Sequence, residues 1–127
     1  MKRRFDPRQG LVIVRSRIWG PTGRAWIQMA LDTGATTTLI NEAQLTAVGY
    51  GLTDASQKIL ITTGSGIERV VRFPMLRLEA LGRTRREFPV LAHTLPPTAS
   101  VDGVLGLDFL RGQTLTLDFR LGEIELD

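Results

Sequence analysis

Asp32 is the acidic residue whose neighbours best suit it to chemistry. It follows an apolar stretch containing Ile27, Met29 and Leu31, and it precedes the run of small residues Thr33-Gly34-Ala35-Thr36. A carboxylate at a strand end, next to a glycine, lies where backbone N–H groups can hold it, and such a group can transfer protons in a reaction. An Asx-turn produces a similar string for purely local reasons. The tripeptide Asp-Thr-Gly alone therefore allows both a catalytic and a structural role.

Chemistry based on cysteine, histidine or a bound metal has little support in the sequence. The chain has no cysteine, which excludes disulfides, thiolate metal sites and a cysteine nucleophile. Its one histidine, His93, cannot form a multi-histidine metal site alone, and its position just before two prolines predicts a loop residue. We therefore predict no metal site and no cofactor. The other acids near loops are interpreted as turn and cap residues: Asp54, Asp102 and Asp108.

Length and composition indicate one folded domain. A chain of 127 residues, 43% of them apolar, can bury one core but cannot supply a second lobe. No apolar run reaches the ~18 residues that a membrane span needs. Arg15 ends the apolar run at residues 11–14, so we expect no secretory signal peptide. Together with the absence of cysteine this favours a cytoplasmic location, and a membrane anchor outside these residues stays open.

The charge of the chain is basic and unevenly distributed. The net charge is +3 and the pI is about 10.2, which invites a nucleic-acid-binding interpretation. However, Arg15, Arg17, Arg72 and Arg77 alternate with apolar residues on expected strands, and no basic motif interleaved with aromatic residues occurs along the sequence. We therefore predict a solvated basic face and no nucleic-acid partner.

The hydrophobic pattern predicts an all-β domain at residues 11–127, preceded by a basic segment at residues 1–10. Residues 11–31 and the acid-edged tail each predict a hairpin, because apolar residues alternate with polar ones on both sides of a turn signal. Asn41 caps a short expected helix that runs through Ala47 and ends at Gly49. The other expected elements are a strand at 37–40, a hairpin with arms at 58–63 and 67–73, a strand pair at 75–80 and 86–92 around a turn at 81–83, a helical turn at 108–112, and tail strands at 114–119 and 123–127.

Three strings in this order resemble the retropepsin-like aspartic proteases. Leu31-Asp32-Thr33-Gly34-Ala35-Thr36 is similar to their active-site loop, residues 62–66 to their flap, and Val104-Leu105-Gly106 to the strand behind the loop. The resemblance covers roughly residues 11–127. It implies a single lobe resembling a closed β-barrel, with one or two short helices.

The resemblance also implies a role for each matching residue. Asp32 would be the catalytic carboxylate, and Thr33 would interlock with the active-site loop of a partner chain. Gly34 would let the substrate backbone approach closely. The remaining matches are the flap residues Thr63, Gly64, Ser65 and Gly66, and the loop-supporting residues Val104, Leu105 and Gly106.

The activity implied is aspartic endopeptidase activity on a peptide or protein substrate. Two carboxyl groups ~3 Å apart share one proton, as is established for aspartic proteases, and one of them then activates a water. Since this chain has a single Asp-Thr-Gly string, the second carboxylate would come from a second copy in a homodimer. The alternative interpretation is a catalytically idle module with the same fold, used for dimerisation or peptide binding.

The chain departs from viral retropepsins at two places. Thr36-Thr37 replaces their acids, and Leu107-Asp108 replaces their arginine, so the chain resembles bacterial and cellular members more closely and substrate preference is not carried over. Ala35 cannot donate the hydrogen bond that a serine or threonine there could give to the carboxylate. We therefore expect an activity optimum that is less shifted to acid pH.

Two arrangements of the chain ends are compatible with the sequence. In one, the tail strands pair across the two-fold axis of the dimer, with basic residues Arg3, Arg4 or Arg8 near acidic residues Glu123, Glu125 or Asp127. In the other, the tail forms a sheet within one chain and the basic N-terminus is disordered.

Overall fold

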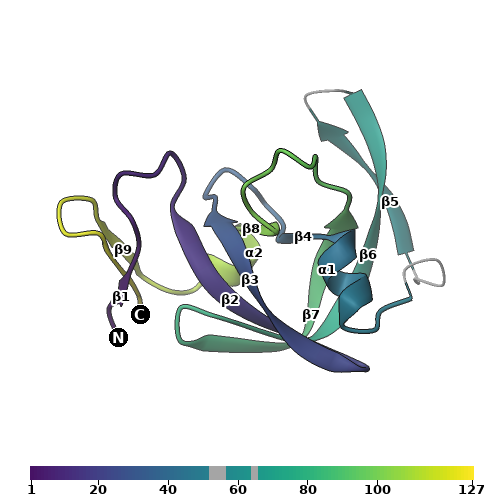
Figure 1. Cartoon of the computed structure of the whole chain (residues 1–127), viewed down its shortest axis with the longest axis horizontal. Coiled ribbons are helices and arrows are strands. Elements are labelled where there is room, and N and C mark those ends of the chain that lie inside the picture. The colour runs from purple at the N-terminus through teal and green to yellow at the C-terminus, as the bar shows by residue number, and fades with distance from the viewer. Residues whose placement is uncertain (52–56, 64–65) are drawn as a thin grey trace.

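The strands close into a barrel. The computed structural model describes residues 1–51, 57–63 and 66–127. Within this part, the hydrogen-bonded order is β2 (Ile13–Gly20), β3 (Gly23–Leu31), β8 (Gly103–Leu105), β4 (Leu39–Asn41), β7 (Arg83–His93) and β6 (Gly66–Ala80). A further pairing of β2 with β6 closes the ring, and β5 (Gln57–Thr63) extends the sheet beyond β6 (Figure 1). The predicted all-β class is confirmed.

A second, smaller sheet brings the two ends of the chain together (Figure 1). It contains β1 (Arg3–Arg4), β10 (Glu123–Leu126) and β9 (Leu115–Asp118), in that order. Arg3 pairs with Ile124, and Leu126 pairs with Leu115, both antiparallel. Ile124 and Leu126 are buried against the barrel, which fixes the face that this sheet presents to the core.

This sheet forms within one chain, as in the second arrangement of the chain ends, but the N-terminus that this arrangement left disordered is part of it. Residues 3 and 4 form a strand because the tail hairpin offers them an unpaired edge. The cations that meet the tail acids are the Met1 amino group, 3.4 Å from Glu125, and Lys2, 3.7 Å from Glu123. The three arginines suggested from the sequence do not form these ion pairs.

Both helices begin close to their predicted positions. The helix α1 (Glu42–Ala47) is capped by Asn41, whose side-chain oxygen accepts a hydrogen bond from the Ala43 N–H at 3.4 Å. The helix α2 (Leu107–Leu110) starts one residue earlier than predicted and ends before Arg111, which is extended. None of the helices in the described ranges is long and apolar enough to cross a membrane.

The strand β6 continues through Pro74, although the sequence predicted two separate strands around it. Pro74 lies directly opposite Pro89 of β7. Neither proline has an N–H to donate. A non-hydrogen-bonded pair of the antiparallel ladder, in which the two residues exchange no N–H···O bonds, therefore suits them. The pairing therefore continues past both prolines, and it is interrupted only at Leu76 and Glu87, which have no paired partner.

The turn after β6 contains two residues rather than the three that were predicted. Leu81 and Gly82 have φ values of 53° and 76°, so both are left-handed, as a tight hairpin turn of the I′ type requires. Ala80 then pairs with Arg83, which belongs to β7. At the far end of β7, His93 pairs with Asn41, so it is a strand residue and not the predicted loop residue.

The core fills the inside of the barrel with side chains from most of its strands. Ile18, Met29, Leu78 and Leu105 are fully buried there. Phe109 of α2 is also fully buried, in an edge-to-face contact with Phe88 of β7 at 5.9 Å between ring centroids. Phe119, predicted on the apolar face of the tail, lies instead in the turn after β9. It is exposed there and contacts Phe5 edge-on.

Tyr50 links the two strands that close the barrel. Its hydroxyl donates a hydrogen bond to the Trp19 carbonyl of β2 at 2.6 Å and accepts one from the Leu76 N–H of β6 at 2.9 Å. Its ring lies 4.9 Å from that of Phe73. Burial raises the pKa of Tyr50 above its ordinary value of 10.0, and the Leu76 N–H partly offsets this effect.

We expect this hydrogen bond to make stability depend on alkaline pH. Because the pKa of Tyr50 is higher in the folded state than in the unfolded state, its contribution is intact below about pH 10 and is lost as the pH rises through the folded value. Urea unfolding at about pH 8 and about pH 10.5 should show a larger loss of unfolding free energy for wild-type protein than for Tyr50→Phe. Tyr50 is the only tyrosine in the sequence, so tyrosinate absorbance reports its pKa directly. A pKa at or below 10 by absorbance would contradict the prediction.

Candidate functional site

Asp32 follows directly after β3 and is held by backbone groups. Its N–H donates to the Leu105 carbonyl of β8 at 3.0 Å, which continues the parallel pairing of β3 with β8. Its Oδ1 accepts a hydrogen bond from the Gly34 N–H at 2.8 Å. This hydrogen bond orients the carboxylate. Because Asp32 is also exposed, the carboxylate is open to a ligand.

The rest of the loop is tied to the segment behind it. The Ala35 N–H donates to the Asp32 carbonyl at 3.2 Å, and the Ala35 carbonyl accepts from the Leu107 N–H at 2.8 Å. Thr33, Gly34 and Thr36 are exposed. The loop therefore presents these residues and the Asp32 carboxylate to solvent, while Ala35 anchors it from behind.

The segment Val104-Leu105-Gly106 runs between β3 and β4, behind the loop. Leu105 pairs with Leu31 in parallel, and Val104 pairs with Leu39 in the antiparallel direction. A side chain at Gly106 would place its Cβ 2.9 Å from the Ala35 carbonyl oxygen, which is closer than packed atoms approach. Glycine at position 106 therefore lets the loop lie directly on this strand.

A buried hydrogen-bond cluster that the sequence analysis missed joins the loop to α2. Thr38 is fully buried; its hydroxyl donates to Asp108 Oδ1 at 2.7 Å and accepts from the Gly106 N–H at 3.1 Å. The Thr38 N–H also donates to both Asp108 carboxylate oxygens at 3.0 Å. Asp108 thus fixes the exit of the loop that carries Asp32, in addition to its predicted role at the start of a helix, where it accepts from the Phe109 N–H.

The sequence contained one signal for this cluster. Thr38 and Ile40 are two residues apart on an extended segment, so they share a face, and Ile40 is fully buried. A threonine on the buried face of a strand needs a hydrogen-bond partner. Nothing in the sequence identified Asp108 as that partner, because the two residues lie far apart along the chain.

Asp102 has a structural role, as expected of a turn residue. Its two carboxylate oxygens accept hydrogen bonds from the Gln28 N–H at 2.9 Å and from the Gln44 side chain at 3.1 Å. Asp54 lies outside the described residues. Within the described part of the chain, no group of three or more histidine, aspartate or glutamate residues could hold a metal ion.

The expected flap corresponds to the hairpin formed by β5 and β6. Thr63 ends β5 and pairs with Gly66, which begins β6. Gly64 and Ser65 lie outside the described residues. Ile67, next to Gly66, is 73% exposed. Figure 1 shows this hairpin extending beyond the body of the barrel, on the same side as the loop between β7 and β8.

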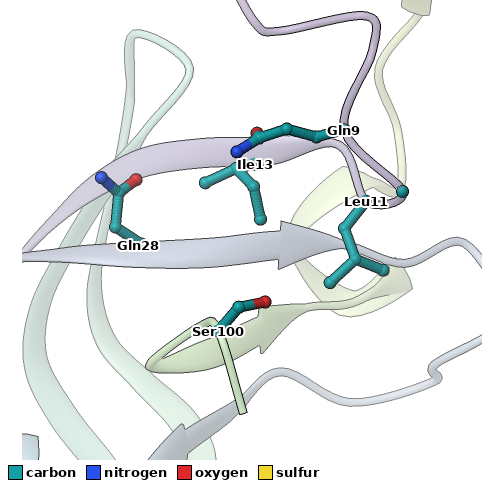
Figure 2. A pocket seen from close by; sticks show the side chains of 6 residues that line it. Gln9, Leu11, Ile13, Gln28 and Ser100 are labelled. Atoms are coloured by element: carbon teal, nitrogen blue, oxygen red, sulfur yellow. The ribbon is translucent and has the colours of Figure 1, made fainter. Parts of the chain in front are cut away.

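A pocket of about 360 Å³ lies beside the end of β3 that leads to Asp32. Its lining combines polar and apolar side chains from three segments: Gln9, Gly10, Leu11, Ile13, Gln28 and Ser100. Figure 2 shows β3, which carries Gln28, running between Ile13 of β2 and Ser100 of the loop before β8. The Leu31 N–H donates to the Val12 carbonyl at 2.9 Å, and Val12 lies between the lining residues Leu11 and Ile13. This bond joins the lining segment to the residue just before Asp32.

We expect loss of the Thr38 hydroxyl to destabilise the loop and the whole domain. Thr38→Val preserves the shape but leaves the Gly106 N–H without its acceptor and Asp108 without one donor, which should lower the unfolding free energy by about 1–3 kcal/mol. Thr38→Ser keeps the hydroxyl and should lose less. Thr36→Val, at an exposed position of the same loop, is the matched control. Equal denaturation midpoints for Thr38→Val and wild type would contradict this role.

Comparison with known proteins supports one family. Residues 22–112, well over half of the chain, match the model of the family described as "gag-polyprotein putative aspartyl protease". A retropepsin-like aspartic protease from Rickettsia conorii is similar in structure, with a TM-score of 0.72 and 15% sequence identity over 99% of this chain and 88% of that one. A search of curated proteins gave no match. The chain therefore belongs to the gag-polyprotein aspartyl protease family and has the retropepsin-like fold.

Proposed function

We propose that this protein is an aspartic endopeptidase whose active site forms when two chains pair and each contributes Asp32. The observation that carries the proposal is the exposed Asp32 carboxylate, oriented by the Gly34 N–H at 2.8 Å directly after β3. Asp102 and Asp108, by contrast, are engaged in hydrogen bonds that hold the fold. Asp32 is thus the acid of this region that is free to act on a substrate.

Two chains are required because one chain carries one such carboxylate. A two-fold axis beside Asp32 brings the two copies together, and the like charges cannot both ionise at close range. The pair then holds one proton between two carboxyl groups, and its protonation steps belong to the pair and not to either residue. One copy is ionised and acts as a base, while the other is protonated and acts as an acid.

The proposed reaction uses both forms of the pair. The ionised carboxylate removes a proton from a water, whose oxygen attacks the carbonyl carbon of the scissile peptide bond. The protonated carboxyl donates its proton to the carbonyl oxygen, so a neutral tetrahedral diol forms. When the C–N bond breaks, the carboxyl that gained the water's proton gives it to the leaving nitrogen, and the other carboxylate takes a proton from a diol hydroxyl as the C=O bond re-forms. The pair is then back in its starting state, with one proton on the same carboxyl as before.

Substrate would lie across the exposed loop, between the barrel and the flap hairpin. The pocket beside β3 offers about 360 Å³ with a mixed lining that includes Leu11, which is 46% exposed. Such a pocket can take one substrate side chain. In the proposed dimer, the exposed Thr33 contacts the partner's loop, and Thr63, Gly64, Ser65 and Gly66 cover the bound peptide.

The two-chain mechanism predicts that a wild-type chain loses its activity when it pairs with an inactive chain. Asp32→Asn should lower cleavage of a peptide library by at least about a thousandfold, because it removes both the base and the acid. Mixed with about a ninefold excess of Asp32→Asn protein, each wild-type chain should keep about a tenth of its activity if pairing is random. The measurement is mass-spectrometric detection of cleavage products.

The matched control is Asp6→Asn, which removes an exposed aspartate that accepts a hydrogen bond from the Arg8 N–H. It should retain full activity, and mixing it with wild-type protein should not lower the activity of the wild-type chains. Full activity of Asp32→Asn would favour an idle, peptide-binding module. Activity per wild-type chain that is independent of the mixing ratio would contradict the shared site.

A second prediction concerns the pH dependence of cleavage. A serine at position 35 can donate a hydrogen bond that favours the ionised carboxylate, so Ala35→Ser should move the acid limb of the activity profile to lower pH. Ala35→Gly adds no donor and is the control. A wild-type profile that peaks below about pH 3 would count against the role assigned to Ala35.

A further inference from the structure

The outer face of β2, β3 and β6 carries a ladder in which arginines and tryptophans alternate. The guanidinium of Arg15 lies 4.1 Å from the Trp26 ring centroid, and that of Arg17 lies 4.7 Å from the same ring. Arg17 is also 5.2 Å from the Trp19 ring, and Arg77 lies 4.0 Å from it on the other strand. These five residues, named here the Arg–Trp ladder, form one continuous run of cation–π contacts.

The strand register creates this ladder. Arg17 pairs with Trp26 on β3, and Trp19 pairs with Arg77 on β6. Residues paired across antiparallel strands point to the same face, and the next residue along, Ile18, is fully buried on the opposite face. The sequence analysis found no basic motif interleaved with aromatic residues because the interleaving occurs across strands and not along the chain.

The face around the ladder is strongly basic. Arg24 pairs with Trp19, and Arg86 pairs with Arg77, so two further exposed arginines point to the same side. The acid in this area is Glu79, whose carboxylate lies 3.4 Å from Arg77. Five arginines around one glutamate leave a surplus of positive charge.

The ladder holds its arginines in place. The Nε atoms of Arg17 and Arg77 are buried, and neither has a hydrogen-bond partner among the described residues. The Arg17 guanidinium contacts both indole rings, and the Arg77 guanidinium is held by the Trp19 ring together with the Glu79 carboxylate. Arginines oriented in this way lose less conformational entropy when they bind a carboxylate.

The function proposed for Asp32 does not use this face. Trp26 precedes Asp32 by six residues along β3, which corresponds to about 20 Å in a strand. A ligand on the ladder would therefore lie far from the reacting carboxylates. Trp26 is 49% exposed, so the face that carries it is open to a ligand.

We propose that the Arg–Trp ladder binds an acidic polypeptide segment in an extended conformation. The planar guanidinium groups suit carboxylates, which they can bind through two hydrogen bonds. Arg15 and Arg17 are two residues apart on β2, about 7 Å, the spacing of side chains on one face of an extended peptide.

The contacts within the ladder favour an acidic peptide over single-stranded nucleic acid. Single-strand binding relies on aromatic rings that are free to stack with bases. Here each indole ring already contacts two guanidinium groups, so a base would have to compete with an arginine for it. A ligand can still reach the N–H groups at the outer edges of the guanidinium groups, and these donors bind anions.

The test is binding of a fluorescently labelled peptide of about ten glutamates to the full chain, measured by anisotropy. Arg15→Gln/Arg24→Gln removes two exposed charges from the face and should raise the Kd about fivefold to thirtyfold. Arg8→Gln/Arg111→Gln removes two exposed charges elsewhere and is the matched control. Trp26→Leu keeps every charge but removes the ring between Arg15 and Arg17, and it should also weaken binding. Circular dichroism verifies that each variant is folded.

Three results would overturn the proposal. One is that the wild-type chain does not bind the peptide. Another is that both double-arginine variants weaken peptide binding equally while Trp26→Leu has no effect. Binding would then depend only on the net charge of the chain and not on the ladder. The third is tighter, ladder-dependent binding of an oligothymidylate of about ten nucleotides, which would assign the face to single-stranded nucleic acid.

Discussion

The buried hydrogen bonds between Thr38, Asp108 and the Gly106 N–H hold the loop that carries Asp32 to the rest of the fold. A charged carboxylate next to a fully buried hydroxyl is stable only when its hydrogen bonds are satisfied, and here Asp108 accepts from the Thr38 N–H, its hydroxyl and the Phe109 N–H. These bonds fix where the loop leaves the core. Its start is fixed separately by the bond from the Asp32 N–H to Leu105.

The loop connects β3 to β4, and β8 lies between these two strands and pairs with both. Both ends of the loop are therefore attached to β8. Short glycine contacts make the arrangement possible: a side chain at Gly103 would meet the Leu39 carbonyl at 2.5 Å. Both ends of the loop are anchored, and the Asp32 carboxylate is held by the Gly34 N–H. The proposed proton transfer would benefit from such preorganisation.

The barrel gives the molecule two separate surfaces to which we assign functions. One end carries the loop with Asp32, the pocket beside β3 and the hairpin formed by β5 and β6. The outer face of β2, β3 and β6 carries the Arg–Trp ladder, about 20 Å away along β3. Because the same strands form both surfaces, the closure of β2 against β6 through Tyr50 orders the ladder as well as the core. An acidic segment held on the ladder would raise the local concentration of a linked peptide near the loop.

The sequence by itself determined the features that depend on neighbours along the chain. Asn41 caps the predicted helix, alternation marks the tail hairpin, and an apolar strand leads to Asp-Thr-Gly. The tertiary structure alone decided what depends on distant pairing. Pro74 stays within a strand because Pro89 lies opposite, residues 3 and 4 become a strand because β10 offers an edge, and Thr38 finds Asp108 seventy residues away. The arginines alternate with tryptophans only once the strands are aligned, because register, and not local order, sets which side chains become neighbours.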